Sequence, residues 1–369
     1  MKRVTVVLIL IAVVAIFLSC SGGGGGGGVF LVGGASIQPR FAYVANEASF
    51  SVSQYKINAD GSLASMATPT VAAGSTPVSV AVDPSGKYAY VANNGSNDVS
   101  QYKINADGSL TSMSTPTVAA GAAPSSVIVD PSGKYAYVTN QNSTDISQYK
   151  INADGSLASM TTPTVAAGAQ PLSVAVDPSG KYAYVANLFS NTVSQFTINA
   201  DGSLLSMATP TVATGTGPES ITVDPSGKYA YVANYNSSDV SQYSIGADGS
   251  LASMATPTVV AGTQPMSITV DPSGKYVYVA NLFSNDVSQY AINADGSLAS
   301  MATPTVAAGI QPVSVTIDAS GKHAYVANII SNNVSQYSIN ANGGLVTMAS
   351  PTVAAGIGPR SVTTVSTHQ

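Results

Sequence analysis

Asparagine recurs every 47 residues along most of this chain, without a single insertion or deletion. The seven positions are Asn46, Asn93, Asn140, Asn187, Asn234, Asn281 and Asn328. Each closes a near-copy of the phrase A-Y-V-A-N, and seven such units fill residues 41–369. A fixed period of this length indicates one supersecondary unit stacked on copies of itself, so it constrains the fold more than any other feature. Residues present in every copy are expected to build the scaffold, and a specific function is expected where the copies differ.

The unit at residues 77–121 predicts four strands. Alternating segments rich in Val, Tyr and Ile favour pleated structure, and they cover residues 78–82, 87–92, 99–104 and 115–120. The phrases D-P-S-G at 83–86 and N-A-D-G at 105–108 carry the residues that tight turns prefer. The proline of the fourth segment favours an edge strand. We therefore predict a four-stranded antiparallel meander without helix.

Seven such meanders predict an all-β chain that forms a seven-bladed β-propeller. The chain enters the repeat at residues 40–44, which match the second strand of a unit. It leaves with residues 359–363, which match a first strand. We expect this C-terminal strand to complete the first blade and so close the ring without open edges. Residues 29–32 could fill the same slot, although they lack the P-x-S-V phrase.

The repeated phrase P-x-S-V-x-V-D-P-S-G-K-Y-x-Y-V-A-N resembles the YVTN-type repeat, and residues 137–140 spell that tetrapeptide. It is also similar to the bacterial lactonase-like propellers, whose namesake is 6-phosphogluconolactonase. The resemblance covers residue 41 to the C-terminus and implies a seven-bladed propeller. It implies little about activity, because one fold hosts many functions.

The first residues form a separate segment. Lys2 and Arg3 precede an apolar stretch at residues 4–18 that has the length of a signal peptide and is short for a membrane span. Phe17-Leu18-Ser19-Cys20 resembles the lipobox of a bacterial lipoprotein. We therefore expect a signal peptide at 1–19, a lipidated Cys20 with a glycine-rich tether at 20–36, and a propeller at 37–369. An ordinary secretory signal with an incidental cysteine is the alternative.

This arrangement would hold an extracytoplasmic domain at the bacterial cell envelope, at the outer membrane or the cell surface. The membrane would be contacted through the lipid alone. Cys20 is the only cysteine, so no intramolecular disulfide can form. The net charge is −5 and the repeats hold no basic run, which argues against nucleic-acid binding. We expect a monomer and predict no cofactor.

Nearly every charge in the repeats belongs to a repeated position. One aspartate opens the first turn of a unit (Asp83, Asp130, Asp177, Asp224, Asp271, Asp318), and another lies in the second turn (Asp60, Asp107, Asp154, Asp201, Asp248, Asp295). Repeated turn aspartates indicate turn chemistry rather than catalysis. The N-x-D-G phrase offers two oxygen ligands where a calcium loop needs five or six, so no metal site is predicted.

Three charged residues of the mature chain lie outside the repeated positions: Glu47, Glu219 and Arg360. Glu219 and Arg360 share one repeat position, directly after the proline that opens a first strand, in blades nearly opposite each other. They are the only catalytic candidates. His323 replaces the tyrosine found at position 88 and is expected to be a packing variant, while His368 lies in the tail. No Ser-His-Asp set is visible.

The copies differ on one face of the predicted ring. In a meander, the turns D-P-S-G and N-A-D-G share one face, and the loops after the second strand share the other with the blade-to-blade connections. This second face carries the predicted binding residues Phe50, Leu188, Phe189, Tyr235, Leu282, Phe283, Ile329 and Ile330, with Met266 at the channel. Exposed apolar surface marks binding sites. Alternatively, these side chains cap the core between blades, or they record drift among duplicates.

Two functions are compatible with this pattern. The first is a non-enzymatic binding or scaffold protein that engages a protein or polysaccharide through the variable face. It is favoured by the face asymmetry and by the lack of a complete catalytic set. The second is a lactonase-like hydrolase or isomerase with its site at the channel mouth. There Arg360 would hold a carboxylate or phosphate, and Glu219 would act as the base.

Overall fold

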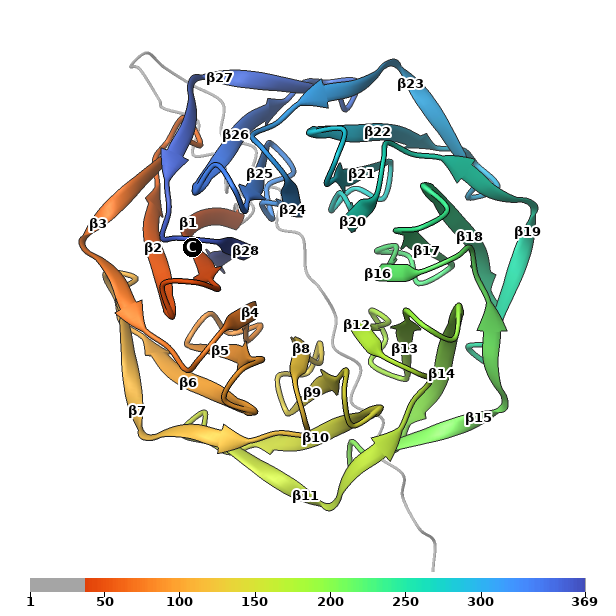
Figure 1. Cartoon of the computed structure of the whole chain (residues 1–369), viewed down its shortest axis with the longest axis horizontal. Helices are drawn as coiled ribbons and strands as arrows, with labels where there is room; N and C mark the ends of the chain where they lie inside the picture. The colour runs from red at the N-terminus through yellow and green to blue at the C-terminus, as the bar shows by residue number, and fades with distance from the viewer. Residues whose placement is uncertain (1–36, 369) are drawn as a thin grey trace, which may run out of the picture. The chain divides into compact units, whose positions relative to one another are not determined.

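The computed structural model describes residues 37–368, and residues 40–366 with their side-chain surroundings. These residues form one compact unit of 28 strands, arranged as seven four-stranded sheets around a central axis (Figure 1). The all-β, seven-bladed propeller expected from the 47-residue period is confirmed. The predicted signal peptide, Cys20 and tether lie outside the described residues. No helix in the described part of the chain is long and apolar enough to cross a membrane.

Strands at the same position in each blade begin at equivalent residues of the repeat and have the same length, except that β28 and β1 of the first blade are longer than their counterparts. The innermost strands are β4 (Pro77–Val82), β8 (Pro124–Val129), β12 (Pro171–Val176), β16 (Pro218–Val223), β20 (Pro265–Val270), β24 (Pro312–Ile317) and β28 (Pro359–His368). The second strands are β1 (Ile37–Asn46), β5 (Tyr88–Asn93), β9 (Tyr135–Asn140), β13 (Tyr182–Asn187), β17 (Tyr229–Asn234), β21 (Tyr276–Asn281) and β25 (His323–Asn328).

The third strands are β2 (Ser51–Ile57), β6 (Asp98–Ile104), β10 (Asp145–Ile151), β14 (Thr192–Ile198), β18 (Asp239–Ile245), β22 (Asp286–Ile292) and β26 (Asn333–Ile339). The outermost strands are β3 (Leu63–Ala72), β7 (Leu110–Ala119), β11 (Leu157–Ala166), β15 (Leu204–Ala213), β19 (Leu251–Val260), β23 (Leu298–Ala307) and β27 (Leu345–Ala354). The strands thus run outward from the channel in chain order in six of the sheets.

The seventh sheet closes the ring. Its order is β28-β1-β2-β3, and β28 pairs antiparallel with β1 through partners such as Phe41 and Val365. The prediction that the C-terminal strand completes the first blade is confirmed, and the slot that residues 29–32 might have filled is occupied by β28. Joining the two ends of the repeat array in one sheet gives the first blade its fourth strand, so that all seven blades are complete.

The outermost strands are longer than the sequence predicts. In the second blade this strand begins at Leu110 rather than at residue 115, and it lies at the sheet edge as its proline requires. The register between β6 and β7 jumps from Ser100–Thr117 to Tyr102–Ser112. Gln101 fills the resulting bulge, where its Nε2 donates to Thr115 O at 3.0 Å. The strand therefore continues through an irregularity that alternation alone does not reveal.

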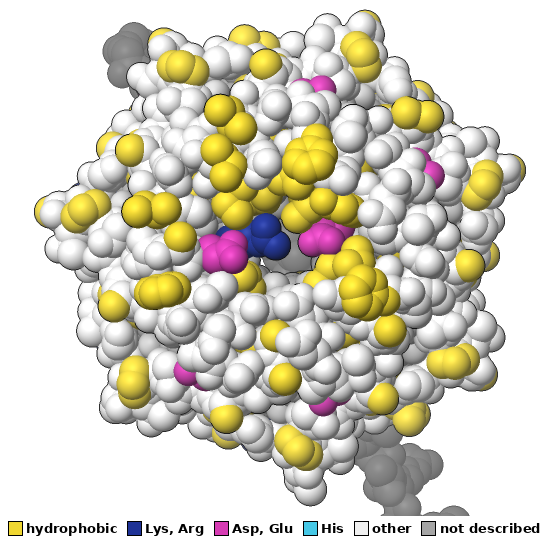
Figure 2. Space-filling view, viewed as in Figure 1, with side chains coloured by type: hydrophobic (Ala, Val, Ile, Leu, Met, Phe, Trp, Pro, Cys, Tyr) yellow, Lys and Arg dark blue, Asp and Glu magenta, His cyan; other side chains and the backbone are white. Residues whose placement is uncertain are grey.

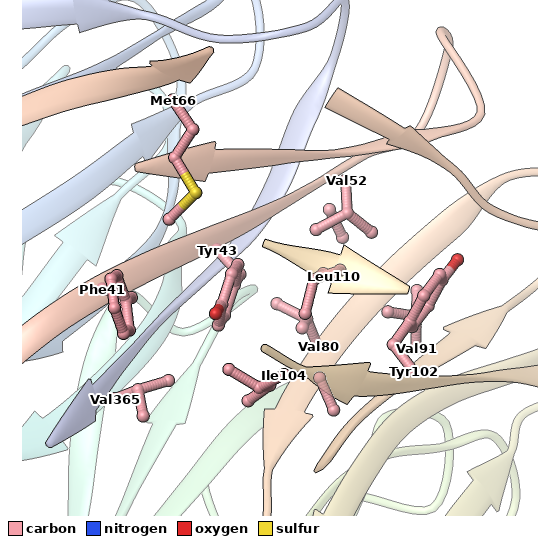
Figure 3. Close-up of a cluster of buried hydrophobic side chains, with 12 residues drawn as sticks. Phe41, Tyr43, Val52, Met66, Val80, Val91, Tyr102, Ile104, Leu110 and Val365 are labelled. Carbon is pink, nitrogen blue, oxygen red and sulfur yellow. The ribbon is translucent and has the colours of Figure 1, made fainter. Parts of the chain in front are cut away.

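The core lies between neighbouring blades and is built from the repeated aromatic and aliphatic residues. Figure 3 shows one such cluster, in which Tyr43 and Phe41 of one blade lie beside Val80 and Val91 of the next. The buried Tyr90 hydroxyl donates to Gly155 O at 2.6 Å, one blade further on. A side chain on Gly155 would collide with the ring of Tyr88, so this glycine is needed for the close approach. Such contacts recur around the ring and fix the spacing of the blades.

The repeated aspartates satisfy turn backbone groups, as the sequence predicts. Asp83 Oδ1 accepts hydrogen bonds from the Lys87 and Tyr88 amides at 2.8 and 2.7 Å. Asp107 Oδ1 accepts from the Ser109 amide and hydroxyl. The seventh blade differs, because His323 Nδ1 lies 2.7 Å from Asp318 Oδ2. Its ring packs over Gly61 as Tyr88 packs over Gly155, so His323 keeps the packing role of the tyrosine.

Candidate functional site

The residue after each opening proline lies in a β-bulge. In β16 the register shifts between Pro218, which pairs with Asn234, and Ser220, which pairs with Ala233. Glu219 is therefore the extra residue, and the same shift occurs in every innermost strand. A bulge releases one residue from the ladder and redirects its side chain. The seven released residues are Val78, Ser125, Leu172, Glu219, Met266, Val313 and Arg360.

These seven side chains surround one cavity at the mouth of the central channel. Its volume is about 270 Å³, and its lining includes Glu219, Arg360 and the loop residues Glu47, Asn94 and Gln141. The structure thus brings together Glu219 and Arg360, which are 141 positions apart in the sequence. Figure 2 shows the opening from this face, with one basic side chain between two acidic ones.

A ring of serines supports the released residues from below. Each follows a bulge residue directly, and in six of the seven blades its hydroxyl accepts the amide of the next blade's innermost strand. For example, Ser220 Oγ accepts from Ile268 N at 3.3 Å, and Ser314 Oγ accepts from Val362 N at 3.2 Å. These hydrogen bonds join neighbouring blades at the channel wall, and they restrain the backbone next to the bulge residues.

Arg360 lies between two carboxylates. Its Nε is 3.8 Å from Glu47 Oε2, and about a third of each side chain is exposed. Across the cavity, desolvation raises the pKa of Glu219 to about 7, and the positive charge of Arg360 opposes this shift only in part. Glu219 keeps some solvent contact at the channel mouth, while protein surrounds most of its carboxyl group. An acid with such a pKa can take up and release a proton near neutral pH.

The variable loops and the variable connections are hydrogen-bonded to each other. The amide of Glu47 donates to Gly358 O at 2.7 Å, and Leu188 N donates to Gln170 O at 2.9 Å. Equivalent bonds occur in the other blades. The two sets of residues in which the copies differ therefore form one continuous face around the cavity, opposite the repeated turns.

The apolar residues of these loops divide into two groups. The apolar or aromatic residues at the first position of a loop are half-buried, and they are Leu188, Tyr235, Leu282 and Ile329. The second residue points outward, with exposed fractions of 72% for Phe189, 54% for Phe283 and 56% for Ile330. Phe50 is 49% exposed, and Met266 is half-buried in the cavity wall. The expected exposure thus holds for Phe50 and for the second residue of these loops, whereas the first residue is partly covered.

A second hollow opens beside the channel mouth. It is an apolar groove of about 460 Å³, lined by Phe50, Ile329, Ile330 and Ile357, among others. Glu47 lines this groove as well as the channel cavity. The sequence showed Glu47 as one of three non-repeated charges but gave no sign of its contact with Arg360. Only the bulge and the loop geometry bring them together.

No group of three or more His, Cys, Asp or Glu side chains within residues 37–368 is placed to hold a metal ion. The mouth of the channel offers two carboxyls, one guanidinium, and the hydroxyl and amide groups of the wall.

Fold and site together define a seven-bladed β-propeller with an acid and an arginine facing one channel cavity. The family described as "Lactonase, 7-bladed beta-propeller" matches residues 35–172 and 163–362, and the chain belongs to this family. The resemblance noted in the sequence is thereby confirmed.

Solved structures show the same architecture. A candidate 6-phosphogluconolactonase from Bacteroides uniformis is 22% identical with a TM-score of 0.77, covering 89% of this chain and 100% of its own. A protein from Lactobacillus plantarum is 20% identical with a TM-score of 0.77, covering 89% and 99%. The periplasmic gluconolactonase of Pseudomonas aeruginosa is 20% identical with a TM-score of 0.75, also covering 89% and 99%. At these identities the likeness establishes the fold. A search of the curated proteins gave no match.

Proposed function

We propose that this protein hydrolyses a lactone in the cavity at the channel mouth. The observation that carries the proposal is the pairing of Glu219, whose pKa is raised to about 7, with Arg360 in one cavity. Membership of the lactonase family and the likeness to a gluconolactonase support the same chemistry. Of the two functions compatible with the sequence, the enzymatic one is therefore favoured.

The reaction needs a base and a group that stabilises negative charge. The Glu219 carboxylate would accept a proton from a water molecule as the water oxygen bonds to the lactone carbonyl carbon. The carbonyl oxygen would become an oxyanion, stabilised by hydrogen bonds from the Arg360 guanidinium. Cleavage of the ring C–O bond would then return the carbonyl, and the leaving ring oxygen would take the proton from Glu219. The product is the open hydroxy acid.

Arg360 retains donors for this role. Among the described residues it forms one ion pair, the long contact from Nε to Glu47, which leaves the terminal nitrogens available to a ligand. A guanidinium presents five N–H donors in a fixed fork, so a single 3.8 Å contact uses little of its capacity. Glu47 would hold the guanidinium in place while a ligand oxygen accepts from the terminal nitrogens.

The test is hydrolysis of a panel of γ- and δ-lactones by the purified protein, followed by acid release. Replacing Glu219 with glutamine removes the base and keeps the shape, and we expect the rate to fall by about 100-fold or more. Asp248→Asn is the matched control, because it makes the same carboxyl-to-amide change in a repeated turn outside the cavity, where the seventh blade carries Asn342. Equal rates for wild type and Glu219→Gln would refute the proposal.

A second candidate function is partner binding at the variable face. The exposed Phe189 and Phe283 favour it, since these aromatic side chains, on the fourth and sixth blades, provide apolar contact area for a protein or a polysaccharide. Replacing both with serine should abolish capture of envelope partners in a pull-down, with lactone hydrolysis unchanged. Retention of every partner by the double variant would count against it.

A further inference from the structure

The first loop residues around the channel mouth are polar on one side of the ring and apolar or aromatic on the other. The first loop residue is polar in the first three blades, where it is Glu47, Asn94 or Gln141. It is apolar or aromatic in the next four blades, where it is Leu188, Tyr235, Leu282 or Ile329. Figure 2 shows hydrophobic side chains along the upper and right rim of the opening, over these four blades. A ligand that matches this rim needs one polar end and one apolar end.

The polar cavity and the apolar groove adjoin each other. The cavity of about 270 Å³ holds Glu219 and Arg360, and the groove of about 460 Å³ begins on the other side of Glu47, which lines both. The groove crosses the loop of the first blade, between Ile330 of the seventh blade and Thr76 at the entry to the second. Its walls are the side chains of Phe50, Ile329, Ile330 and Ile357.

Phe50 departs from the repeat in a way that local structure does not favour. Its φ is +50°, a left-handed conformation that asparagine tolerates and that a bulky aromatic residue rarely adopts. The equivalent residues of the other six blades share this conformation, and they are Asn97, Thr144, Asn191, Ser238, Asn285 and Asn332. Each of these four asparagines accepts the amide of the following connection at 2.7–2.8 Å. Phe50 cannot accept the equivalent amide of Thr76, so this blade gives up both a favourable conformation and a link to its neighbour.

Backbone strain of this kind persists where the side chain has a use. Phe50 is not buried in the core, since about half of it is exposed, and the surface it contacts is the groove. We therefore expect the Phe50 side chain to contact a ligand in the groove rather than to stabilise the fold.

We infer that the substrate is a lactone that carries an apolar chain. This inference rests on the proposed function: the lactone ring lies in the cavity between Glu219 and Arg360, and the chain runs past Glu47 into the groove beside Phe50. The charges of the cavity favour a neutral ring over a phosphorylated one. With Glu219 ionised for catalysis, two carboxylates face one guanidinium, and a further anion would be repelled.

The test compares two neutral lactones that differ in the length of the side chain, γ-valerolactone and γ-dodecalactone. We expect kcat/KM to be at least about tenfold higher for γ-dodecalactone, because its additional methylene groups leave water for the groove. Phe50→Asn should bring the ratio of the two kcat/KM values close to about one, since it removes the aromatic wall. This variant should fold, because four blades carry asparagine at this position.

The control is Leu205→Asn, which removes an exposed apolar side chain from the outermost strand β15, away from the groove. It should leave the ratio at the wild-type value. A wild-type ratio near one, with both lactones hydrolysed, would refute the apolar-chain inference and leave the proposed function standing.

Calorimetric measurement of γ-dodecalactone binding to Glu219→Gln tests the chain site independently of hydrolysis. Binding that Phe50→Asn weakens in this background supports the groove as the chain site, even if wild type hydrolyses neither lactone and the proposed function fails. Absence of measurable binding, or binding that the Phe50→Asn change leaves unaltered, would overturn the inference.

Discussion

Arg360 Nε lies 3.8 Å from Glu47 Oε2, so a residue of the last strand pairs with the loop that follows the first. The two are 313 positions apart and meet because β28 completes the blade that β1 begins. Closure of the ring and construction of the candidate site therefore depend on the same strand pairing. Glu47 has no charged equivalent in another blade, and the only charged equivalent of Arg360 is Glu219, which is consistent with a function added to the repeated scaffold.

The pH dependence of lactone hydrolysis should follow the ionisation of Glu219. Its pKa is raised to about 7 by desolvation, and the ionised form is the base. We expect kcat/KM to rise with pH and to reach half its maximum near pH 7, because this parameter reports the free enzyme. The measurement is a rate profile from pH 3.5 to pH 9, with Asp248→Asn, in a repeated turn outside the cavity, as the control. A midpoint near 4.5 would show that Glu219 titrates normally or is not the base.

Glu219 should also make folding stability depend on pH. The folded-state pKa lies above the unfolded value, so the folded protein binds the proton more tightly between about pH 4.5 and pH 7. The contribution is fully present below pH 4.5 and is lost as pH rises through 7. Glu219→Gln should therefore unfold like wild type at pH 4 and be more stable at pH 8, by about 1–2 kcal/mol after allowance for partial exposure. Denaturant unfolding at the two pH values measures this, and an equal difference at both would contradict it.

Phe50→Asn should stabilise the protein. Asparagine tolerates the left-handed conformation at φ +50° and can accept the Thr76 amide, as Asn97 accepts that of Ala123 at 2.7 Å. The expected gain in the free energy of unfolding is about 1 kcal/mol. The reverse change, Asn97→Phe, should destabilise the second blade by a similar amount. Thermal unfolding of both variants tests the prediction, and a destabilised Phe50→Asn would show that the aromatic ring contributes to the fold.

The buried tyrosine hydroxyls should contribute to blade-to-blade cohesion. Tyr231 is fully buried, and its hydroxyl donates to Gly296 O at 2.6 Å. Tyr231→Phe leaves this buried carbonyl without its donor, so we expect a loss of about 1–2 kcal/mol in the free energy of unfolding. Tyr229→Phe is the control, since the Tyr229 hydroxyl is exposed and lies 3.5 Å from Ala294 O. Equal effects of the two changes would contradict the assignment.

Attachment to the membrane remains a proposal that rests on the lipobox-like sequence around Cys20. If the cysteine is lipidated, Cys20→Ser should move the protein from the membrane fraction to the soluble fraction of the cell envelope. Met266→Leu should fractionate like wild type, because it changes the propeller alone. Unchanged fractionation of Cys20→Ser would favour the ordinary secretory signal.

The fold could be predicted because its determinants are local and repeated. Turn phrases such as D-P-S-G and alternating segments such as K-Y-A-Y-V-A specify each meander without reference to distant residues. The out-of-phase ends of the repeat array predicted ring closure. The outermost strands were predicted too short, because the bulge that Gln101 fills interrupts alternation and is held by a hydrogen bond to Thr115 O.

The candidate site could be predicted only in part. Subtracting the repeated positions isolated Glu47, Glu219 and Arg360, and the shared repeat position of the latter two placed them around one channel. The sequence alone determined the propeller, the variable face and these three charges, since each depends on periodicity. The tertiary structure decided that the bulges turn Glu219 and Arg360 into one cavity, that Glu47 pairs with Arg360, and that Phe50 walls an adjoining groove. These facts depend on backbone irregularities and on contacts between residues hundreds of positions apart, which a local pattern does not encode.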